Sequence, residues 1–111
     1  MTWIAYKEEH LVIVKISDYT KGDTATSYEN GRQCLEQILT VIDEHEKIEL
    51  DFSGVDFVIT AFLNPVIGDL ILKKGPSVMK KVSIINANAN TIQKIKMVKD
   101  GALLKREDLI D

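Results

Sequence analysis

Apolar residues recur along the chain with two different periods, and these periods predict an alternation of strands and helices. Short runs rich in β-branched residues are typical of strands, and apolar residues three or four positions apart are typical of helices that pack on a core. The predicted strands cover residues 2–6, 10–17, 47–52 and 81–86, with a further extended run over 55–60. The predicted helices cover residues 27–46, about 62–74 and 91–98.

This order predicts an α/β fold, with a mixed sheet of four or five strands and three or four helices. The polar residues Lys7, Glu8 and Glu9 separate the first two strands and predict the turn of an N-terminal antiparallel hairpin. Each later strand–helix–strand unit needs a crossover connection, which places its helix against a largely parallel sheet. Residues 18–26 are rich in turn formers and predict a loop.

Polar residues, glycine and proline indicate where the first two helices begin and end. Ser27 is the predicted N-cap of the first helix, and Gly75, which follows two lysines, is a stop signal for the second. The second helix has two candidate starts, at Thr60 or at Asn64. Asn64 followed by Pro65 is the stronger local signal, because proline suits the first position of a helix. The sequence therefore predicts that Thr60 lies in an irregular turn before the helix.

The third helix is predicted to begin after Asn88 or Asn90 and to end at Asp100-Gly101, a turn-forming pair. Its apolar residues recur at helical spacing and are expected to face the core: Ile92, Ile95 and Val98. Beyond it, residues 102–111 mix apolar residues with charges, and their pattern favours neither type of element.

The overall composition predicts one globular domain over residues 1–111. Of the 111 residues, 45% are hydrophobic and 28% are charged, and the net charge is -3. Single domains commonly have this length, and disordered chains are less apolar and more highly charged. The lack of a basic excess argues against binding of nucleic acid, which depends on neutralising phosphates. No segment has the pattern of a secretory signal, so a cytoplasmic location is expected.

The most apolar stretch, residues 55–72, is predicted to belong to a soluble core. A membrane-spanning helix needs about 20 mostly apolar residues. This stretch contains Asp56, Asn64 and Asp69, which would be costly in a bilayer. No membrane partner is therefore expected.

Carboxylates are plentiful in the sequence, but it contains only one cysteine and two histidines. The single cysteine, Cys34, excludes an internal disulfide and a cysteine zinc site, and its place in the apolar stripe of the first helix predicts a buried thiol. His10 and His45 lie far apart in the sequence and are predicted to be surface residues. No glycine-rich phosphate loop, metalloprotease or nucleophile-elbow motif is present. No catalytic residue, metal or cofactor is therefore predicted.

Two carboxylates, Asp51 and Asp56, flank the Ser53-Gly54 turn and have two interpretations. Paired carboxylates can perform acid–base catalysis when a cleft perturbs their pKa values. Aspartate, serine and glycine are also the residues that a tight turn requires. The second interpretation is preferred because it needs no cleft.

Residues 50–60 resemble the STAS domains of bacterial anti-sigma-factor antagonists. In those domains a strand that ends like LDLSGV is followed by an aromatic residue and then by a phosphorylated serine or threonine. Here Leu50–Val55 reads LDFSGV, Phe57 is the aromatic residue, and Thr60 falls on the phosphoacceptor position. The antagonists carry an aspartate before the phosphoacceptor, and Ile59 replaces it in this chain.

The chain is more similar to a divergent, uncharacterised STAS-like family of the DUF4325 type. Members of that family carry DFSGV, a spot rich in serine or threonine, FLN or similar, and a glycine within the following helix. The corresponding residues here are Asp51–Val55, Ile59–Ala61, Phe62–Asn64 and Gly68. The resemblance covers about residues 27–100.

The resemblance implies a non-catalytic regulatory domain that binds other proteins. The implied partner is a kinase of the histidine-kinase-like ATPase fold, or a similar anti-sigma-like regulator. Thr60 is the implied phosphoacceptor, and a phosphate there would add about -1.5 to -2 charges and could release the partner. The implied docking surface comprises the junction and the exposed face of the second helix: Ser53, Asp56, Ile59, Thr60, Phe62, Asn64 and Asp69.

Two other classes of function remain open from the sequence. An adaptor or structural domain without a phosphoswitch is favoured by the apolar Ile59 and Phe62. An exposed Phe62 would be a docking anchor, whereas a buried Phe62 would belong to the core. A domain that binds a small ligand or an anion would use polar residues near the ends of the strands: Asp51, Asp56, Thr60 and Asn86.

A homodimer is a further alternative. Trp3 and Tyr6 lie on a predicted edge strand, and an edge strand can pair with another chain. The competing interpretation is that these two aromatic side chains cover the core.

Overall fold

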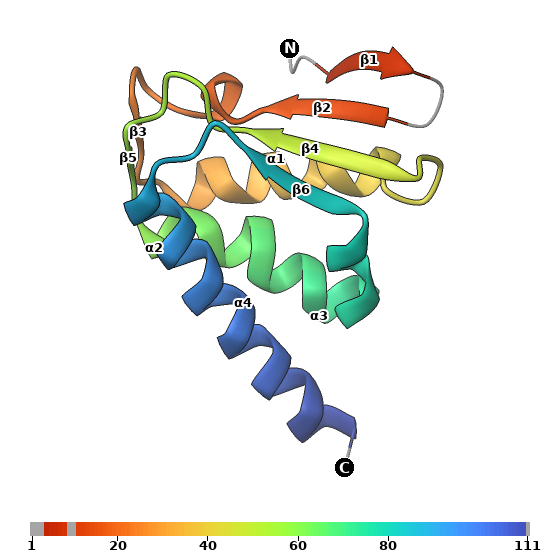
Figure 1. Cartoon of the computed structure of the whole chain (residues 1–111). Helices are drawn as coiled ribbons and strands as arrows, with labels where there is room; N and C mark the ends of the chain where they lie inside the picture. Colours follow the sequence, from red (N-terminus) through yellow and green to blue (C-terminus); the bar gives the residue numbers. More distant parts are fainter. Residues whose placement is uncertain (1–3, 9–10, 111) are drawn as a thin grey trace.

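A sheet of four strands forms one layer of the molecule, and the helices pack beneath it (Figure 1). The computed structural model describes residues 4–8 and 11–110, and the side chains of residues 11–105. Its strands and helices are β1 (Ile4–Glu8), β2 (Leu11–Lys15), β3 (Thr24–Ala25), α1 (Tyr28–Val41), β4 (Lys47–Asp51), β5 (Phe57–Val58), α2 (Thr60–Leu63), α3 (Leu70–Lys74), β6 (Val82–Ile85) and α4 (Ala89–Ile110). The remaining elements are 3₁₀ turns at Ile16–Tyr19 and Pro76–Lys80 and a π-helical segment at Asn64–Asp69.

The strand order in the main sheet is β1-β2-β4-β6, and β2, β4 and β6 are parallel to one another. Alternate residues face the helices, so Val12 and Val14 of β2 and Ile48 and Leu50 of β4 are fully buried. Glu49, between the last two, faces the opposite side of the sheet and is partly exposed. The predicted α/β class is therefore confirmed.

β1 runs antiparallel to β2 along the edge of the sheet. The sequence predicts a turn that includes Lys7 and Glu8, but both residues belong to the strand. The pairing accommodates them through a shift in register between Tyr6 and Glu8. Because an edge strand is open to water on one side, charged residues such as Lys7 and Glu8 are tolerated within it. Trp3 and His10 lie outside the described residues, as does the side chain of Tyr6.

A second, two-stranded sheet lies beside the β4–α2 connection. β3 pairs in parallel with β5, with Thr24 opposite Phe57. The Ile59 N–H donates to the Ala25 carbonyl at 3.0 Å and so holds the start of α2 against β3. The prediction of a loop over residues 18–26 is therefore wrong at β3, because this strand forms only through a partner more than thirty residues away.

The core lies between the main sheet and the helices α1, α2 and α3. Ser27 caps α1 as predicted, since its side chain accepts a hydrogen bond from the Asn30 N–H at 3.1 Å. α1 ends at Val41, earlier than predicted, because the chain turns there to enter β4. The largest fully buried side chains include Ile16, Ile38, Phe52, Phe62, Ile67 and Ile71. No helix in the described part of the chain is long and apolar enough to cross a membrane.

The second helix begins at Thr60 and not at Asn64, so the predicted cap at Asn64 is wrong. Ile59 has extended backbone angles, and Thr60 is the first helical residue. Pro65 consequently lies inside the helical stretch, where it has no N–H to donate and its ring crowds the carbonyl one turn earlier. The π-helical segment widens the backbone around Pro65, which relieves this crowding. The stretch ends at Gly75 as predicted, with a φ of 91°.

α4 begins after Asn88, whose side-chain oxygen accepts a hydrogen bond from the Thr91 N–H at 2.8 Å. The helix continues past its predicted end at Gly101 and runs to residue 110. A single exposed glycine costs a helix only about 1 kcal/mol, and burial of the next residue, Ala102, favours continuation. Ile92 was predicted to face the core but is exposed, and Thr91 is buried instead.

Candidate functional site

The junction between β4 and β5 is a tight corner. The Ser53 N–H donates to Asp51 Oδ1 at 2.9 Å, and the Val55 N–H donates to the Phe52 carbonyl at 3.0 Å. Gly54 has a φ of 78°, a conformation that other residues rarely adopt. Phe52 and Val55 are buried, whereas Ser53 and Gly54 are exposed. The residues between the two aspartates are therefore those that this turn requires.

Asp51 connects the ends of β4 and β6. Its Oδ1 accepts a second hydrogen bond, at 2.9 Å, from the side-chain amide of Asn86. Partial burial opposes ionisation, but the hydrogen bonds from Asn86 and Ser53 and the charge of Lys15 outweigh it, so the pKa of Asp51 is lowered. A carboxylate held in its ionised form is poorly suited to exchange protons near neutral pH. Asp51 and Asn86 lie together as predicted, but they bind each other.

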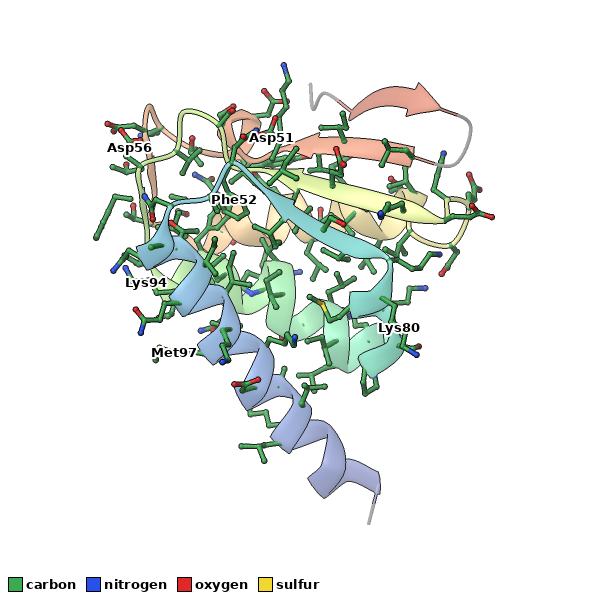
Figure 2. The ribbon with its side chains drawn as sticks, viewed as in Figure 1. Asp51, Phe52, Asp56, Lys80, Lys94 and Met97 are labelled. Atoms are coloured by element: carbon green, nitrogen blue, oxygen red, sulfur yellow. The ribbon has the colours of Figure 1, made fainter. Side chains whose placement is uncertain are left out.

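Asp56 does not form a carboxylate pair with Asp51. Its N–H donates to the Asp23 carbonyl at 2.8 Å, and its carbonyl accepts a hydrogen bond from the Asn88 side chain at 2.8 Å. Its side chain is exposed, and Figure 2 shows the carboxylates of Asp51 and Asp56 apart from each other. The backbone of Asp56 therefore connects β3, β5 and the start of α4.

Lys94 anchors α4 to β5. Its Nζ donates to the Val58 carbonyl at 2.7 Å and lies 4.8 Å from the centre of the Phe57 ring. This arrangement is a cation–π contact, and it partly covers an aromatic side chain that is 49% exposed. The first turns of α4 are thereby held next to the residues that lead into α2.

Thr60 is exposed at the first position of α2, and no described residue forms a hydrogen bond with its hydroxyl. The preceding residue, Ile59, is partly buried. Phe62 has no exposed surface. Its assignment to the docking surface is therefore wrong, because a side chain enclosed by the core cannot contact a partner.

A groove of about 410 Å³ runs between the α2–α3 helical stretch and α4. We call it the Thr60 groove. Its lining residues are Thr60, Asn64, Gly68, Asp69, Leu72, Met97, Val98, Gly101, Ala102 and Lys105. Figure 2 shows Met97 on the α4 wall. Polar groups and apolar groups thus share one concave surface.

The structure brings together some of the predicted docking residues and separates others. Thr60, Asn64 and Asp69 line the groove from one side. Ser53 and Asp56 are exposed at the β4–β5 corner, outside the groove. The predicted surface therefore divides into two exposed regions.

The opposite wall of the groove was not predicted, because the third helix was expected to end at Gly101. Ile95, Val98 and Ala102 follow helical spacing and face the body of the protein, which was a usable signal that the helix continues. The adjacent face of the same turns supplies Met97 and Lys105 to the groove.

Cys34 is fully buried in α1, as predicted, and burial raises the pKa of its thiol. A buried neutral thiol is a poor nucleophile, since the thiolate is the reactive form. Among the described residues, no group of three or more His, Cys, Asp or Glu side chains could hold a metal ion.

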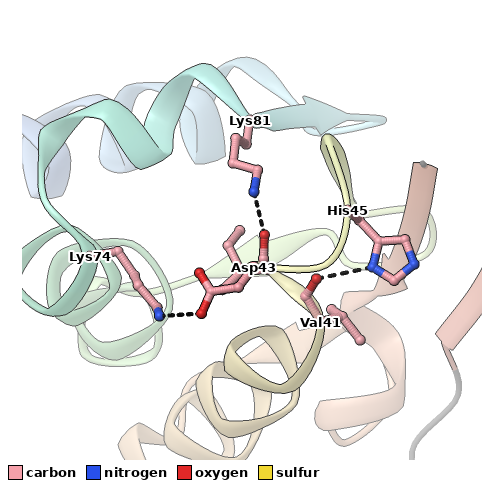
Figure 3. Close-up of polar contacts among 6 residues, drawn as sticks. Val41, Asp43, His45, Lys74 and Lys81 are labelled. Atoms are coloured by element: carbon pink, nitrogen blue, oxygen red, sulfur yellow. Dashed lines mark hydrogen bonds and ion pairs between the residues drawn. The ribbon is translucent and has the colours of Figure 1, made fainter.

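Three polar contacts hold the end of α1 to its surroundings (Figure 3). The Nδ1 atom of His45 lies 3.0 Å from the carbonyl oxygen of the last α1 residue. Lys74 donates to Asp43 at 2.7 Å, and Lys81 donates to the Ile42 carbonyl. The hydrogen bond from Lys74 also lowers the pKa of Asp43. The contacts of His45 and Lys81 are to backbone carbonyls at the helix end, where such groups lack partners within the helix, and this gives His45 a structural role.

A family model described as a STAS-like domain of unknown function (DUF4325) matches residues 30–91. The match runs from α1 to the first turn of α4 and includes the corner, Thr60 and the α2–α3 wall of the groove. No curated protein and no solved structure matches the chain significantly.

Proposed function

This chain belongs to the family of STAS-like domains, and we propose that it is a non-catalytic regulatory domain that binds a protein partner through the Thr60 groove. The proposed partner is a histidine-kinase-like ATPase or a similar signalling regulator, and the proposed switch is phosphorylation of Thr60. The observation that carries the proposal is the position of Thr60. It is exposed at the start of α2, its hydroxyl has no hydrogen bond to a described residue, and it lines a groove.

The composition of the groove suits a protein partner. Leu72 and Met97 supply apolar surface, and Met97 is 64% exposed. Methionine is enriched at the centres of protein interfaces, which polar residues surround. Asn64, Asp69 and Lys105 supply polar groups of this kind around the same groove.

A phosphate on Thr60 would change the groove by charge. It would add about -1.5 to -2 charges to a surface that already contains the carboxylate of Asp69. A charge left unpaired in an interface costs about 2–5 kcal/mol. Each 1.4 kcal/mol is roughly tenfold in affinity, so one phosphate suffices to release a partner.

The environments of Asp51 and Cys34, the two residues considered for acid–base and nucleophilic chemistry, support a non-catalytic role. Asp51 is held by hydrogen bonds from Asn86 and Ser53, and Cys34 is buried. Neither side chain is prepared for acid–base or nucleophilic chemistry.

Ile59 favours a second candidate function, an adaptor that uses the same groove without phosphorylation. In the antagonists that the chain resembles, an aspartate precedes the phosphoacceptor, whereas here a partly buried isoleucine does so. The two candidates differ only in the role of Thr60, so substitutions at Thr60 separate them.

The test begins with capture of the partner from an extract of the source organism and its identification by mass spectrometry. The affinity of the purified partner is then measured by calorimetry for the wild type, Thr60→Ala, Thr60→Asp and Asp69→Lys. Thr40→Asp is the matched control, because Thr40 is exposed on α1 and does not line the groove.

We expect Thr60→Ala and Thr40→Asp to bind as the wild type does and Thr60→Asp to bind at least tenfold more weakly. Equal affinities of Thr60→Asp and Thr60→Ala, together with a loss for Asp69→Lys, would support the adaptor. Wild-type affinity for both Thr60→Asp and Asp69→Lys would contradict the groove as the docking surface.

A further inference from the structure

β6 lies at an edge of the main sheet, and none of the described strands pairs with its outer side (Figure 1). The carbonyls of Lys81 and Ile85 point inward, since they accept hydrogen bonds from the β4 side at 2.8 and 3.0 Å. The backbone groups of successive residues in a strand point to opposite edges, so those of Val82 and Ile84 point outward. Within the described part of the chain, these outward groups form no hydrogen bond.

The sequence of β6 does not protect this edge. Exposed edge strands are usually blocked by proline, by a bulge or by charged residues. β1, at the other edge, has a register shift and contains Lys7 and Glu8. β6 reads Val-Ser-Ile-Ile, its pairing has no shift, and all four of its residues are partly exposed. β6 is therefore more available than β1 for hydrogen bonding to an additional strand.

We propose that β6 pairs antiparallel with β6 of a second copy of this chain, so that the two main sheets form one continuous sheet. The positions of the outward groups are self-complementary. Val82 of each copy can exchange both backbone hydrogen bonds with Ile84 of the other copy. The two-fold axis then passes beside Ser83, and the two Ser83 residues form a non-hydrogen-bonded pair with Cα atoms about 4.5 Å apart.

The charges at the two ends of β6 favour this antiparallel arrangement. Lys80 and Lys81 precede the strand, and Figure 2 shows Lys80 pointing outward. The ionised carboxylate of Asp51 lies on β4 beside the last residue of β6. In the proposed register, the backbone of Lys81 in the second copy lies two strand spacings, or about 10 Å, from Asp51. Its ammonium group stays bound to the Ile42 carbonyl of its own copy, so its attraction to Asp51 acts over a distance and without a direct contact. A parallel copy would instead place the lysines of the two chains side by side.

Cross-linking tests the register directly. Ser83→Cys places two thiols across the two-fold axis at a separation that a disulfide can bridge. Cys34 is buried and does not compete. Ser77→Cys is the control, because Ser77 is exposed in the 3₁₀ turn before β6 and lies off the strand. Under mild oxidation we expect at least ten times more covalent dimer from Ser83→Cys than from Ser77→Cys. Equal yields would overturn the proposal.

Sedimentation equilibrium tests the dimer without a cross-link. Ser83 faces the side of the sheet without helices, so Ser83→Lys adds like charges across the axis while leaving the core intact. We expect this variant to raise the dimer dissociation constant at least tenfold and Ser77→Lys to leave it unchanged, with circular dichroism confirming that both fold.

A wild type that is monomeric at every accessible concentration would overturn the proposal, and so would a dimer insensitive to Ser83→Lys. The first result would leave β6 free for a strand of another protein, and the second would place the contact elsewhere, such as at β1. Neither result bears on the Thr60 groove, because Ser83 does not line it.

Discussion

Gly31 of α1 lies against Pro65 of the π-helical segment, with no space for a side chain between them. A Cβ atom on Gly31 would lie 2.8 Å from Pro65 Cγ and still closer to the carbonyl oxygen of Phe62. The absence of a side chain at Gly31 therefore lets α1 pack directly on the part of the second helix that Pro65 widens. This contact supports the helix that presents Thr60.

We expect Gly31→Ala to lower the free energy of unfolding by about 1–3 kcal/mol, because the backbone carbonyl of Phe62 cannot move without displacing the helix. Urea unfolding measures this value. Gly101→Ala is the matched control, since a Cβ there meets nothing within 4 Å. It should stabilise the protein by about 0.5–1 kcal/mol, as alanine is the better helix former. Wild-type stability of Gly31→Ala would contradict the close contact.

We expect Thr91→Val to raise the free energy of unfolding by about 1 kcal/mol. The Thr91 hydroxyl is buried and has no hydrogen-bond partner among the described residues, so an isosteric methyl group removes an uncompensated polar atom. The control is Thr40→Val, because Thr40 is exposed and its hydroxyl donates to the Gln37 carbonyl. This control should change stability by less than about 0.5 kcal/mol. Destabilisation by Thr91→Val would show that a water molecule or another group satisfies the hydroxyl.

Asp51 should make stability depend on pH in the acid range. Its pKa is lowered in the folded protein, so its stabilising effect is complete above the ordinary aspartate value and is lost as the pH falls through the folded value. We expect the difference in unfolding free energy between the wild type and Asp51→Asn to shrink on acidification. Asn86→Gly keeps the positive φ of residue 86 but removes the amide donor. NMR titration should show a higher pKa for Asp51 in this variant than in the wild type. An equal pKa in the two proteins would contradict the role of Asn86.

Cys34 should not react with thiol reagents in the folded protein, because it is buried and its pKa is raised. A colorimetric disulfide reagent at pH 8 should modify it only after denaturant is added. The Ser77→Cys variant provides an internal reference, since its new thiol is exposed and should react at once. Rapid modification of the native wild type would show that α1 opens readily.

The sequence predicted one wall of the groove, on the α2–α3 helical stretch, but not the opposite wall on α4. The LDFSGV motif and its spacing to Thr60 identified the corner, and the positions of Asn64 and Asp69 placed them on the following helix. Thr60, Asn64 and Asp69 all line the groove. Phe62 was misplaced, because an aromatic side chain near an exposed residue has the same local pattern whether it faces the core or a partner. The α4 wall was missed because the helix was expected to end at Gly101. A glycine ends a helix only where burial of the residues after it does not favour continuation, and here Ala102 is buried.

Local sequence was sufficient for features that depend on neighbouring residues. The order of the helices and of the strands in the main sheet, the Ser27 cap, the end at Gly75 and the burial of Cys34 all follow from periodicity and from side chains within one or two turns. Tertiary structure decided features that depend on distant partners. β3 exists because β5 pairs with it, and the second helix continues through Pro65 because Gly31 leaves room for the ring. Packing energy between residues that are distant in the sequence outweighs a local preference of a few kcal/mol. That energy cannot be predicted from any single segment of the sequence.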